Sequence, residues 1–303
     1  MNRLIGIGAC VMDTLITLPV FPQEDTKLRA LEVKTCGGGP AATGLVAAAR
    51  LGISAGYIGV LAGDEGGRFL LEDFARYGVD TTGTERLGRC RSFTSSIWLN
   101  ARQRSRTCVF DKGDLPPLTL SEEQKRMAAQ AELLLVDGNE LDAAVEAAGI
   151  IRQAGGRVLY DAGGLYEGVE RLLECTDILI PSEEFALGHT GKATAEQAAQ
   201  ALYAVYHPRV VVITQGKKGG LFYDGERLLA YPAYPADVVD SNGAGDVFHG
   251  AFAAGLLHGY TEEACCHYAS AASALKCGGT GARESAPRHD DVLDLLRRNG
   301  YEL

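Results

Sequence analysis

Short apolar runs recur along the chain, and each is followed by a polar or glycine-rich turn and then by a segment with helical spacing. The runs read as buried strands at 4–12, 133–137, 157–161, 177–181 and 210–214. The segments with helical spacing lie at 141–154, 166–174, 261–277 and 290–298. Short, uniformly apolar strands that alternate with helices are typical of a mostly parallel sheet covered on both faces. The pattern therefore predicts an α/β fold with three layers.

Two stretches follow a different pattern, because apolar and polar residues alternate in them. Residues 15–36 alternate loosely, and residues 93–99 and 107–110 flank a turn that carries Arg102, Arg104 and Arg106. Alternation of this kind indicates strands with one exposed face. We expect a small β-lid built from roughly 14–36 and 88–112, on a single domain of residues 1–303. The three arginines mark either a solvated hairpin tip or a contact to an anionic group of a substrate.

Composition excludes several classes of protein. Of the 303 residues, 46% are apolar and 22% are charged, which is ordinary for a soluble globular chain, and no apolar run is long enough to cross a membrane. The net charge of −10 argues against nucleic acid as a partner. The N-terminal residues show no signal peptide, and the eight cysteines lack C-x-x-C spacing. These features predict a cytoplasmic protein without structural zinc.

The turn at residues 240–246 contains the strongest candidate chemistry. Gly243 and Gly245 have no Cβ, so the backbone N–H groups of Gly243, Ala244 and Gly245 can face a charged oxygen at the start of a helix. Asp246 stands at the mouth of this anion hole. It is either a helix N-cap or a general base that accepts the proton of an attacking hydroxyl group.

A second glycine cluster, Gly37, Gly38 and Gly39, precedes a helix of small residues at 40–52. Such a loop permits close approach of a ligand to the backbone, or simply tight packing of the chain. Asp13, near the end of the first apolar run, is either a turn residue or a carboxylate that accepts hydrogen bonds from substrate hydroxyls.

The residues at 239–252 and 37–52 resemble the motifs of the ribokinase-like (PfkB) carbohydrate kinases, whose signature is D-[ST]-x-G-A-G-D-x-F-x-G. The resemblance covers nearly the whole chain in the expected order. It implies a three-layer α/β/α fold with a β-lid. It also implies ATP and Mg²⁺ as cosubstrates, and transfer of the γ-phosphoryl group to a primary alcohol of a sugar or nucleoside. Asp246 would be the base, and Gly243, Ala244 and Gly245 would form the anion hole.

The same resemblance implies further site residues. ATP would contact the turns after two strands, at Thr214, Gly216, Gly219, Gly243, Gly245 and Gly279. Asp240 and Asn242 stand where relatives hold a monovalent cation, so K⁺ is a further candidate. The family's P-N-x-x-E element, which organises Mg²⁺, is degenerate here, because residues 181–185 read P-S-E-E-F. Glu183 and Glu184 are the candidates to replace its carboxylate.

Two features of the sequence bear on the identity of the substrate: one departure from the family's motifs and one further resemblance. Ala42 replaces the Asn that many relatives use to reach a sugar hydroxyl, and the segments G-G-G-P-A-A-T, G-D-V-F-H-G-A and A-L-K-C are similar to those of sulfofructose kinases. Lys27 falls at the spacing where such an enzyme would place a cation, although Phe110 and Asn139 do not supply the remaining sulfonate contacts. We therefore predict a ketose or related sugar, with the sulfonated ketohexose as one candidate, bound by Asp13, Lys27 and the three glycines.

Two alternatives remain open. The first is a nucleoside kinase of the same fold, for which Phe93 and Trp98 would line a base pocket; both residues could equally fill the core of the lid. The second is a relative without catalytic activity that only binds a sugar or nucleotide. Exposed lid strands favour a homodimer that pairs through the lid.

Overall fold

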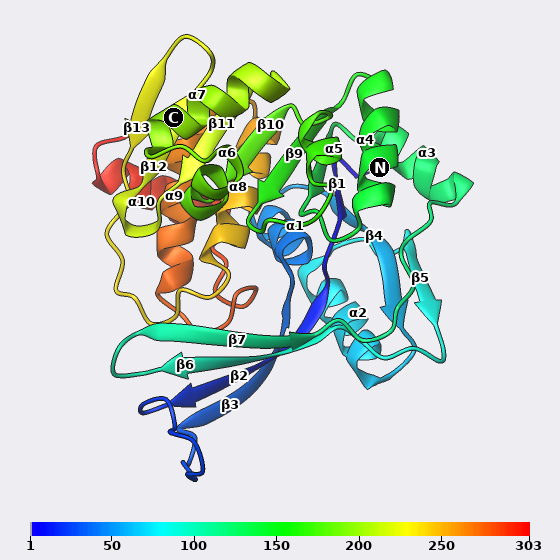
Figure 1. Cartoon of the computed structure of the whole chain (residues 1–303), viewed down its shortest axis with the longest axis vertical. Coiled ribbons are helices and arrows are strands. Elements are labelled where there is room, and N and C mark those ends of the chain that lie inside the picture. The colour runs from blue at the N-terminus through cyan, green and yellow to red at the C-terminus, as the bar shows by residue number, and fades with distance from the viewer. Residues whose placement is uncertain (1) are drawn as a thin grey trace.

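A computed structural model describes residues 2–303 and contains a nine-stranded sheet (Figure 1). Strand β12 is antiparallel to both of its neighbours, β11 and β13, and all other neighbouring strands are parallel. In spatial order the strands are β13 (Leu228–Tyr231), β12 (Gly220–Tyr223), β11 (Val210–Thr214), β10 (Ile178–Pro181), β9 (Arg157–Ala162), β8 (Leu133–Val136), β1 (Leu4–Ile7), β4 (Ala55–Ala62) and β5 (Thr84–Leu87).

Helices cover both faces of this sheet, so the predicted three-layer fold is confirmed. On one face lie α1 (Pro40–Arg50), α2 (Glu65–Tyr77), α8 (Ala244–His258), α9 (Glu262–Cys277) and α10 (His289–Arg298). On the other lie α3 (Glu122–Gln130), α4 (Leu141–Gln153), α5 (Glu170–Leu173), α6 (Glu183–Thr190) and α7 (Ala195–Tyr206). A 3₁₀ turn, η1 (Gly216–Lys218), joins β11 to β12. Among residues 2–303, no helix combines the length and apolar character needed to cross a membrane.

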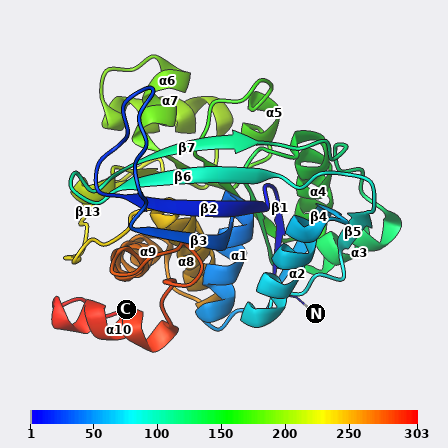
Figure 2. The same cartoon turned by 90° about the horizontal axis from the view of Figure 1, so that it is seen from below.

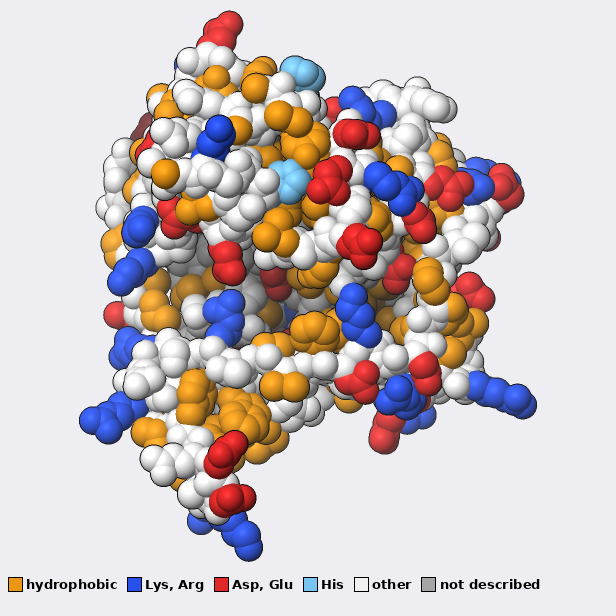
Figure 3. Space-filling model, viewed as in Figure 1, with side chains coloured by type: hydrophobic (Ala, Val, Ile, Leu, Met, Phe, Trp, Pro, Cys, Tyr) orange, Lys and Arg blue, Asp and Glu red, His pale blue; other side chains and the backbone are white. Residues whose placement is uncertain are grey.

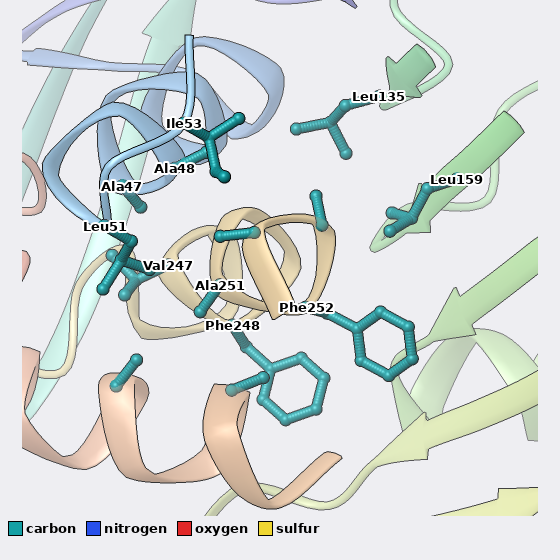
Figure 4. Close-up of a cluster of buried hydrophobic side chains, with 14 of the residues drawn as sticks. Ala47, Ala48, Leu51, Ile53, Leu135, Leu159, Val247, Phe248, Ala251 and Phe252 are labelled. Atoms are coloured by element: carbon teal, nitrogen blue, oxygen red, sulfur yellow. The ribbon is translucent and has the colours of Figure 1, made fainter. Parts of the chain in front are cut away.

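Helix α8 is the central helix of its layer, and almost all of its residues from Val247 onward are buried. Figure 4 shows helix α8 between helix α1 and the strands that carry Leu135 and Leu159, with Phe248 on the side of α8 that faces away from α1. Because the helix is apolar on every side, it is held by packing rather than by one amphipathic face. The first turn of α8 is therefore fixed in place by a rigid core.

A second sheet of four strands, which we call the lid, crosses one side of the molecule (Figure 2). In spatial order its strands are β3 (Glu32–Gly38), β2 (Val11–Leu18), β6 (Thr94–Asn100) and β7 (Ser105–Asp111). Strand β2 follows β1, so the lid lies at the carboxyl end of the parallel strands, where ligands bind in open α/β sheets.

The expected single strand over 4–12 is wrong. The chain leaves the large sheet after Ile7 and enters the lid at Val11. Between these points the backbone N–H of Ala9 donates to the Oδ2 atom of Asp137 at 2.8 Å, and not to a neighbouring strand. Asp13 consequently lies within β2 and not after it.

Candidate active site

The turn before α8 has the geometry of an anion hole. Gly243 is the N-cap of α8 with φ of 73°, a left-handed conformation that suits glycine. Ala244, Gly245 and Asp246 form the first helical turn, and Gly245 is exposed. The first N–H groups of a helix lack partners within the helix and carry a partial positive charge, so this exposed start favours a negatively charged ligand.

Asp246 is half-buried in this first turn, within a set of charged groups. Burial raises the pKa of its carboxyl group; the positive charges of His249 and Arg106 partly offset this rise, while Asp13 and Asp137 add to it. A carboxylate with a raised pKa is a stronger base than an ordinary aspartate, as proton abstraction from an alcohol requires.

Asp13 and the glycine loop meet on the inner face of the lid. The Ser95 hydroxyl of β6 donates to Asp13 Oδ1 at 2.6 Å, and a Cβ added to Gly38 would lie only 1.9 Å from Asp13 Oδ2. Gly37 and Gly38 end β3, and Gly39 caps α1. The structure thus places Asp13 against the triple-glycine loop. The negative charge of Asp13 also raises the pKa of Asp246. Burial raises the pKa of Asp13, and the Ser95 hydrogen bond partly counteracts this.

Two buried charged groups hold the loop in place from behind. Arg283 donates to the carbonyl oxygen of Gly38 at 2.6 Å and to Asp73 Oδ2 at 2.7 Å. Asp137, which follows β8, accepts from the backbone N–H groups of Ala9 at 2.8 Å and Ala41 at 3.0 Å. The loop therefore has little freedom to move when a ligand binds.

On the other side of the 240–246 turn lies a cavity of about 520 Å³. Four of the six residues predicted to bind the nucleotide line it, namely Thr214, Gly216, Gly219 and Gly245. Its apolar walls include Tyr231, Phe248 and Ala274. Gly243 lies in the adjoining turn, and Gly279 lies in the loop after α9; neither is among the lining residues. A cavity of this size with one polar end suits an aromatic base and its phosphates.

Beneath the start of α8, His249 joins three elements. Its Nδ1 atom lies 2.7 Å from the carbonyl oxygen of Gly245, and its Nε2 atom lies 3.0 Å from that of Ile180. Nδ1 is also 3.1 Å from Asp161 Oδ2, at the end of β9. Carbonyl oxygens only accept, so each of these bonds needs a proton on the ring nitrogen that makes it. Burial lowers the pKa of His249 and raises the pKa of Asp161, so it works against the charged form of both partners. This pair fixes Gly245 to the carboxyl ends of β9 and β10.

The degenerate metal element has a structural explanation. Phe185, at the position of the expected Glu, is only 1% exposed and packs in the core between Tyr160 and His189. Glu183 is half-buried, and its Oε1 accepts from Gln215 Nε2 at 2.6 Å, next to the nucleotide cavity. Glu184 is exposed. Of the two candidates, Glu183 is therefore the carboxylate that lies beside the cavity.

The predicted cation residues lie around a lysine side chain. Asp240 is buried, its Oδ1 accepts from the Asn242 N–H at 2.8 Å, and Lys276 of α9 contacts it from the core. Lys27, the residue proposed to bind an anionic substrate, is exposed in the loop between β2 and β3. That loop extends from the lid away from the nine-stranded sheet in Figure 1. The structure therefore does not bring Lys27 together with Asp13 and Asp246.

Sequence reasoning missed several residues that shape the site. Asp137 and Asp161 each follow or end a buried strand, and this position at the carboxyl end of parallel strands was an available signal. His249, Lys276 and Arg283 lie in otherwise apolar or small-residue segments, where a charged residue requires a buried partner. In each case the partner is distant in sequence, so the pairings themselves could not be predicted.

Comparison with known proteins agrees with this geometry. A model of the pfkB family carbohydrate kinases matches residues 1–289. The chain belongs to this family. The predicted family, fold and enzyme class of carbohydrate kinase are thereby confirmed.

Individual relatives extend over nearly the full chain. Ribokinase of Haemophilus influenzae is 26% identical over 302 residues, covering 97% of this chain and 98% of that protein. Aminoimidazole riboside kinase of Salmonella typhimurium is 31% identical over 290 residues, covering 86% and 88%. A solved structure of Arabidopsis thaliana ribokinase complexed with ribose and ATP has a TM-score of 0.86 and 27% identity, covering 98% and 99%.

Proposed function

We propose that this kinase transfers the γ-phosphoryl group of ATP to a primary hydroxyl group of a small sugar. One observation carries the proposal: Asp246 stands in the first turn of α8, at a glycine-lined helix start and near enough to Asp13 for the Asp13 charge to raise its pKa. The nucleotide cavity opens on one side of this turn and the lid covers the other.

The chemistry follows from the placement of charge. A sugar hydroxyl bonded to Asp13 and to the Gly37–Gly39 loop would lie within reach of Asp246, which accepts its proton as the oxygen attacks phosphorus. The N–H groups of Gly243, Ala244 and Gly245 stabilise the charge on the phosphoryl oxygens. Positioning and electrostatic stabilisation account for most of the catalysis in this class of reaction.

Mg²⁺ fits this site as an ion shared with the nucleotide. Bound Mg²⁺ keeps several waters and uses only one or two protein carboxylates. Glu183 can therefore supply the carboxylate that the degenerate element lacks at Phe185. The ion would neutralise charge on the β- and γ-phosphates. Glu183 would hold it through water, in a position fixed by Gln215.

The residues of the site also bear on which sugar is phosphorylated. We retain a ketose or related sugar, but the exposed position of Lys27 gives no support to an anionic group such as the sulfonate of sulfofructose. A cytoplasmic location also remains a prediction of the sequence, from its scattered cysteines.

A second candidate substrate is a nucleoside, and a specific observation favours it. Phe110 pairs with Ser95 across β6 and β7, so it shares the inner face of the lid with Asp13. Its ring lies 5.8 Å from that of Phe93, and 60% of the residue is exposed. This aromatic pair can stack on a heterocycle, and the Salmonella relative is named for a riboside. Trp98, by contrast, pairs with Ile16 on the outer face and does not line such a pocket.

The exposed outer face of the lid supports a homodimer. Leu31, Val33 and Val109 are each more than 60% exposed there, and a second lid would cover them. Figure 3 shows apolar side chains gathered on the lid below the hollow that separates it from the rest of the molecule.

The decisive experiment measures ADP release with ribose, fructose, fructose 1-phosphate, sulfofructose, 2-keto-3-deoxygluconate and a riboside, in wild type and Asp246→Asn. We expect turnover of at least one neutral sugar or riboside, reduced roughly 10²- to 10⁴-fold in the variant, since loss of a general base has this effect. ATP binding, measured by calorimetry, should persist in the variant. Unchanged turnover in Asp246→Asn would exclude the proposed base, and ATP binding without any turnover would favour a relative that only binds.

A further inference from the structure

Lys276 is a fully buried cation behind the turn at residues 240–246. It belongs to the last turn of α9 and is 0% exposed. Its Nζ atom donates to the backbone carbonyl oxygen of Asp240 at 2.6 Å and lies 3.5 Å from Asp240 Oδ2. One ammonium group thus contacts both the main chain and the side chain of the same aspartate.

Asp240 in turn holds three segments together. Its Oδ1 accepts from the Asn242 N–H at 2.8 Å, and its Oδ2 accepts from the Gly281 N–H at 3.0 Å. The N–H groups of Val239 and Asp240 donate to the carbonyl oxygen of Cys277 at 2.8 and 3.2 Å. The turn that leads into the anion hole is therefore fastened to the end of α9 and to the loop that follows.

The ammonium form of Lys276 fits this environment. Burial lowers the pKa of Lys276, and the charge of Asp240 counteracts that effect. A carbonyl and a carboxylate oxygen can only accept hydrogen bonds, so they require a donor that carries protons. A buried carboxylate without a cation would be costly, whereas the pair balances charge inside the protein.

These contacts leave no place for a metal ion on the same oxygens. Asp240 and Asn242 stand where relatives of this family are expected to hold a monovalent cation. The oxygens that Asp240 could offer to an ion are its carbonyl oxygen and its carboxylate, and Lys276 Nζ lies 2.6 Å from the first and 3.5 Å from Oδ2 of the second. The residues of this chain therefore do not fit K⁺ at this position.

We infer that the Lys276 ammonium takes the place of a monovalent cation and makes this kinase independent of K⁺. Lys276 is a positioning residue, since it does not line the nucleotide cavity and acts through the 240–242 turn on the anion hole that follows. It supplies a positive charge from the chain itself where an exchangeable ion would otherwise be required. The inference rests on the proposed function only where activity is the readout.

The first test uses the wild-type protein without substrate. Its melting temperature is measured in KCl and in tetramethylammonium chloride at equal ionic strength. A protein that binds K⁺ in its folded state gains stability as the concentration of K⁺ rises. We expect the same melting temperature in both salts, and the same kcat. A melting temperature or kcat that rises in KCl alone would overturn the inference.

The second test uses two variants that differ in the space they leave. Lys276→Ala removes the charge and opens a cavity, while Lys276→Met removes the charge and fills much of the space. We expect both variants to melt below wild type in tetramethylammonium chloride. Only Lys276→Ala should recover melting temperature and activity in KCl. The exposed Lys192→Ala serves as the control for loss of a surface charge.

The outcomes separate the two proposals. A folded Lys276→Ala that gains nothing from KCl would show that Lys276 does not stand in for an ion. If this variant does not fold, the wild-type comparison decides alone. Absence of turnover with every sugar would count against the proposed function, and the melting data would still decide the role of Lys276.

Discussion

The two sides of the active site are built differently. On the side of the nine-stranded sheet, the anion hole is held by buried groups, since Lys276, Asp240, Asp161 and His249 all have side chains no more than 6% exposed. On the lid side, every residue of β7 is exposed. Arg106 of β7 contacts the nine-stranded sheet and its helices, which we call the body, through a hydrogen bond of 3.4 Å to Ser241. Asp13, on the inner face of the lid, is buried, as are its lid neighbours Leu15, Cys36 and Ile97.

This difference assigns different tasks to the two sides. Buried groups with several partners keep the anion hole in one geometry, which favours stabilisation of a transition state. A segment with few buried contacts opens at low cost in free energy, as a cover over a substrate must do. Substitutions on the body side should therefore change stability and turnover together, whereas substitutions on the lid should change kinetics and leave the melting temperature almost unaltered.

The largest effect is expected for His249→Leu on the body side. The substitution leaves the carbonyl oxygens of Gly245 and Ile180 without a donor and Asp161 without a partner. A buried acceptor left without a donor costs about 1–3 kcal/mol of unfolding free energy, and this substitution leaves two. Denaturant unfolding measures this cost, and kcat should fall in parallel because Gly245 shifts. The double variant His249→Leu with Asp161→Leu should recover part of the stability; no recovery would contradict the pairing.

The next effect concerns Asp13→Asn, at the junction of the two sides. The amide oxygen can still accept from Ser95, but it binds substrate hydroxyls less strongly, so kcat/KM should fall by roughly 10- to 100-fold, about 1.4–2.7 kcal/mol. Sugar titrations measure this fall in kcat/KM. Melting temperatures at several pH values measure the accompanying change in stability.

The sign of the stability change is fixed by the pKa of Asp13, which burial raises. Because the folded pKa is raised, the carboxyl group costs stability as the pH rises from its unfolded pKa to its folded pKa. The penalty is complete above the folded pKa and disappears below the unfolded pKa. Asp13→Asn should therefore melt at or above the wild-type temperature at neutral pH, and the difference should vanish in acid. A lower melting temperature at neutral pH would indicate that Asp13 is a structural residue.

The sequence predicted most of the body and less of the lid side. Strand and helix positions in the body follow from local apolar patterns, and the helix expected at 261–277 is found as Glu262–Cys277. The break between β1 and β2 could not be predicted, because it depends on Asp137, which lies 128 residues from Ala9. The inner position of Phe110 and the outer position of Trp98 depend likewise on strand register, which local patterns do not define.

Arg106 offers a test of how far the lid takes part in catalysis. It lines a cavity of about 320 Å³ between lid and body together with Ser241, which also lines the nucleotide cavity. Because Arg106 is exposed, Arg106→Gln should lower kcat/KM only about tenfold, less than the loss of a buried anion-hole donor, and the effect should shrink in high salt. Arg102→Gln, on the same turn, is the matched control and should behave as wild type.

The pH profile gives a second readout of Arg106. Its charge lowers the pKa of Asp246, which burial raises above the ordinary value. Removal of Arg106 should raise that pKa further, so the acidic limb of the kcat/KM profile should move to higher pH. An unmoved limb in Arg106→Gln, with activity lost, would show that Arg106 does not face the catalytic carboxylate.

The smallest effect on stability is expected on the outer face of the lid. Val33 is 62% exposed, so Val33→Glu should change the unfolding free energy by less than about 0.5 kcal/mol. If two lids pair through this face, the same substitution places two carboxylates in the interface and should convert a dimer to a monomer in sedimentation velocity. Phe110→Glu, equally exposed on the inner face, should leave the mass unchanged. A wild-type monomer would refute lid pairing. A dimer that survives Val33→Glu would place the interface elsewhere, and the lid of each subunit would then be free to open independently.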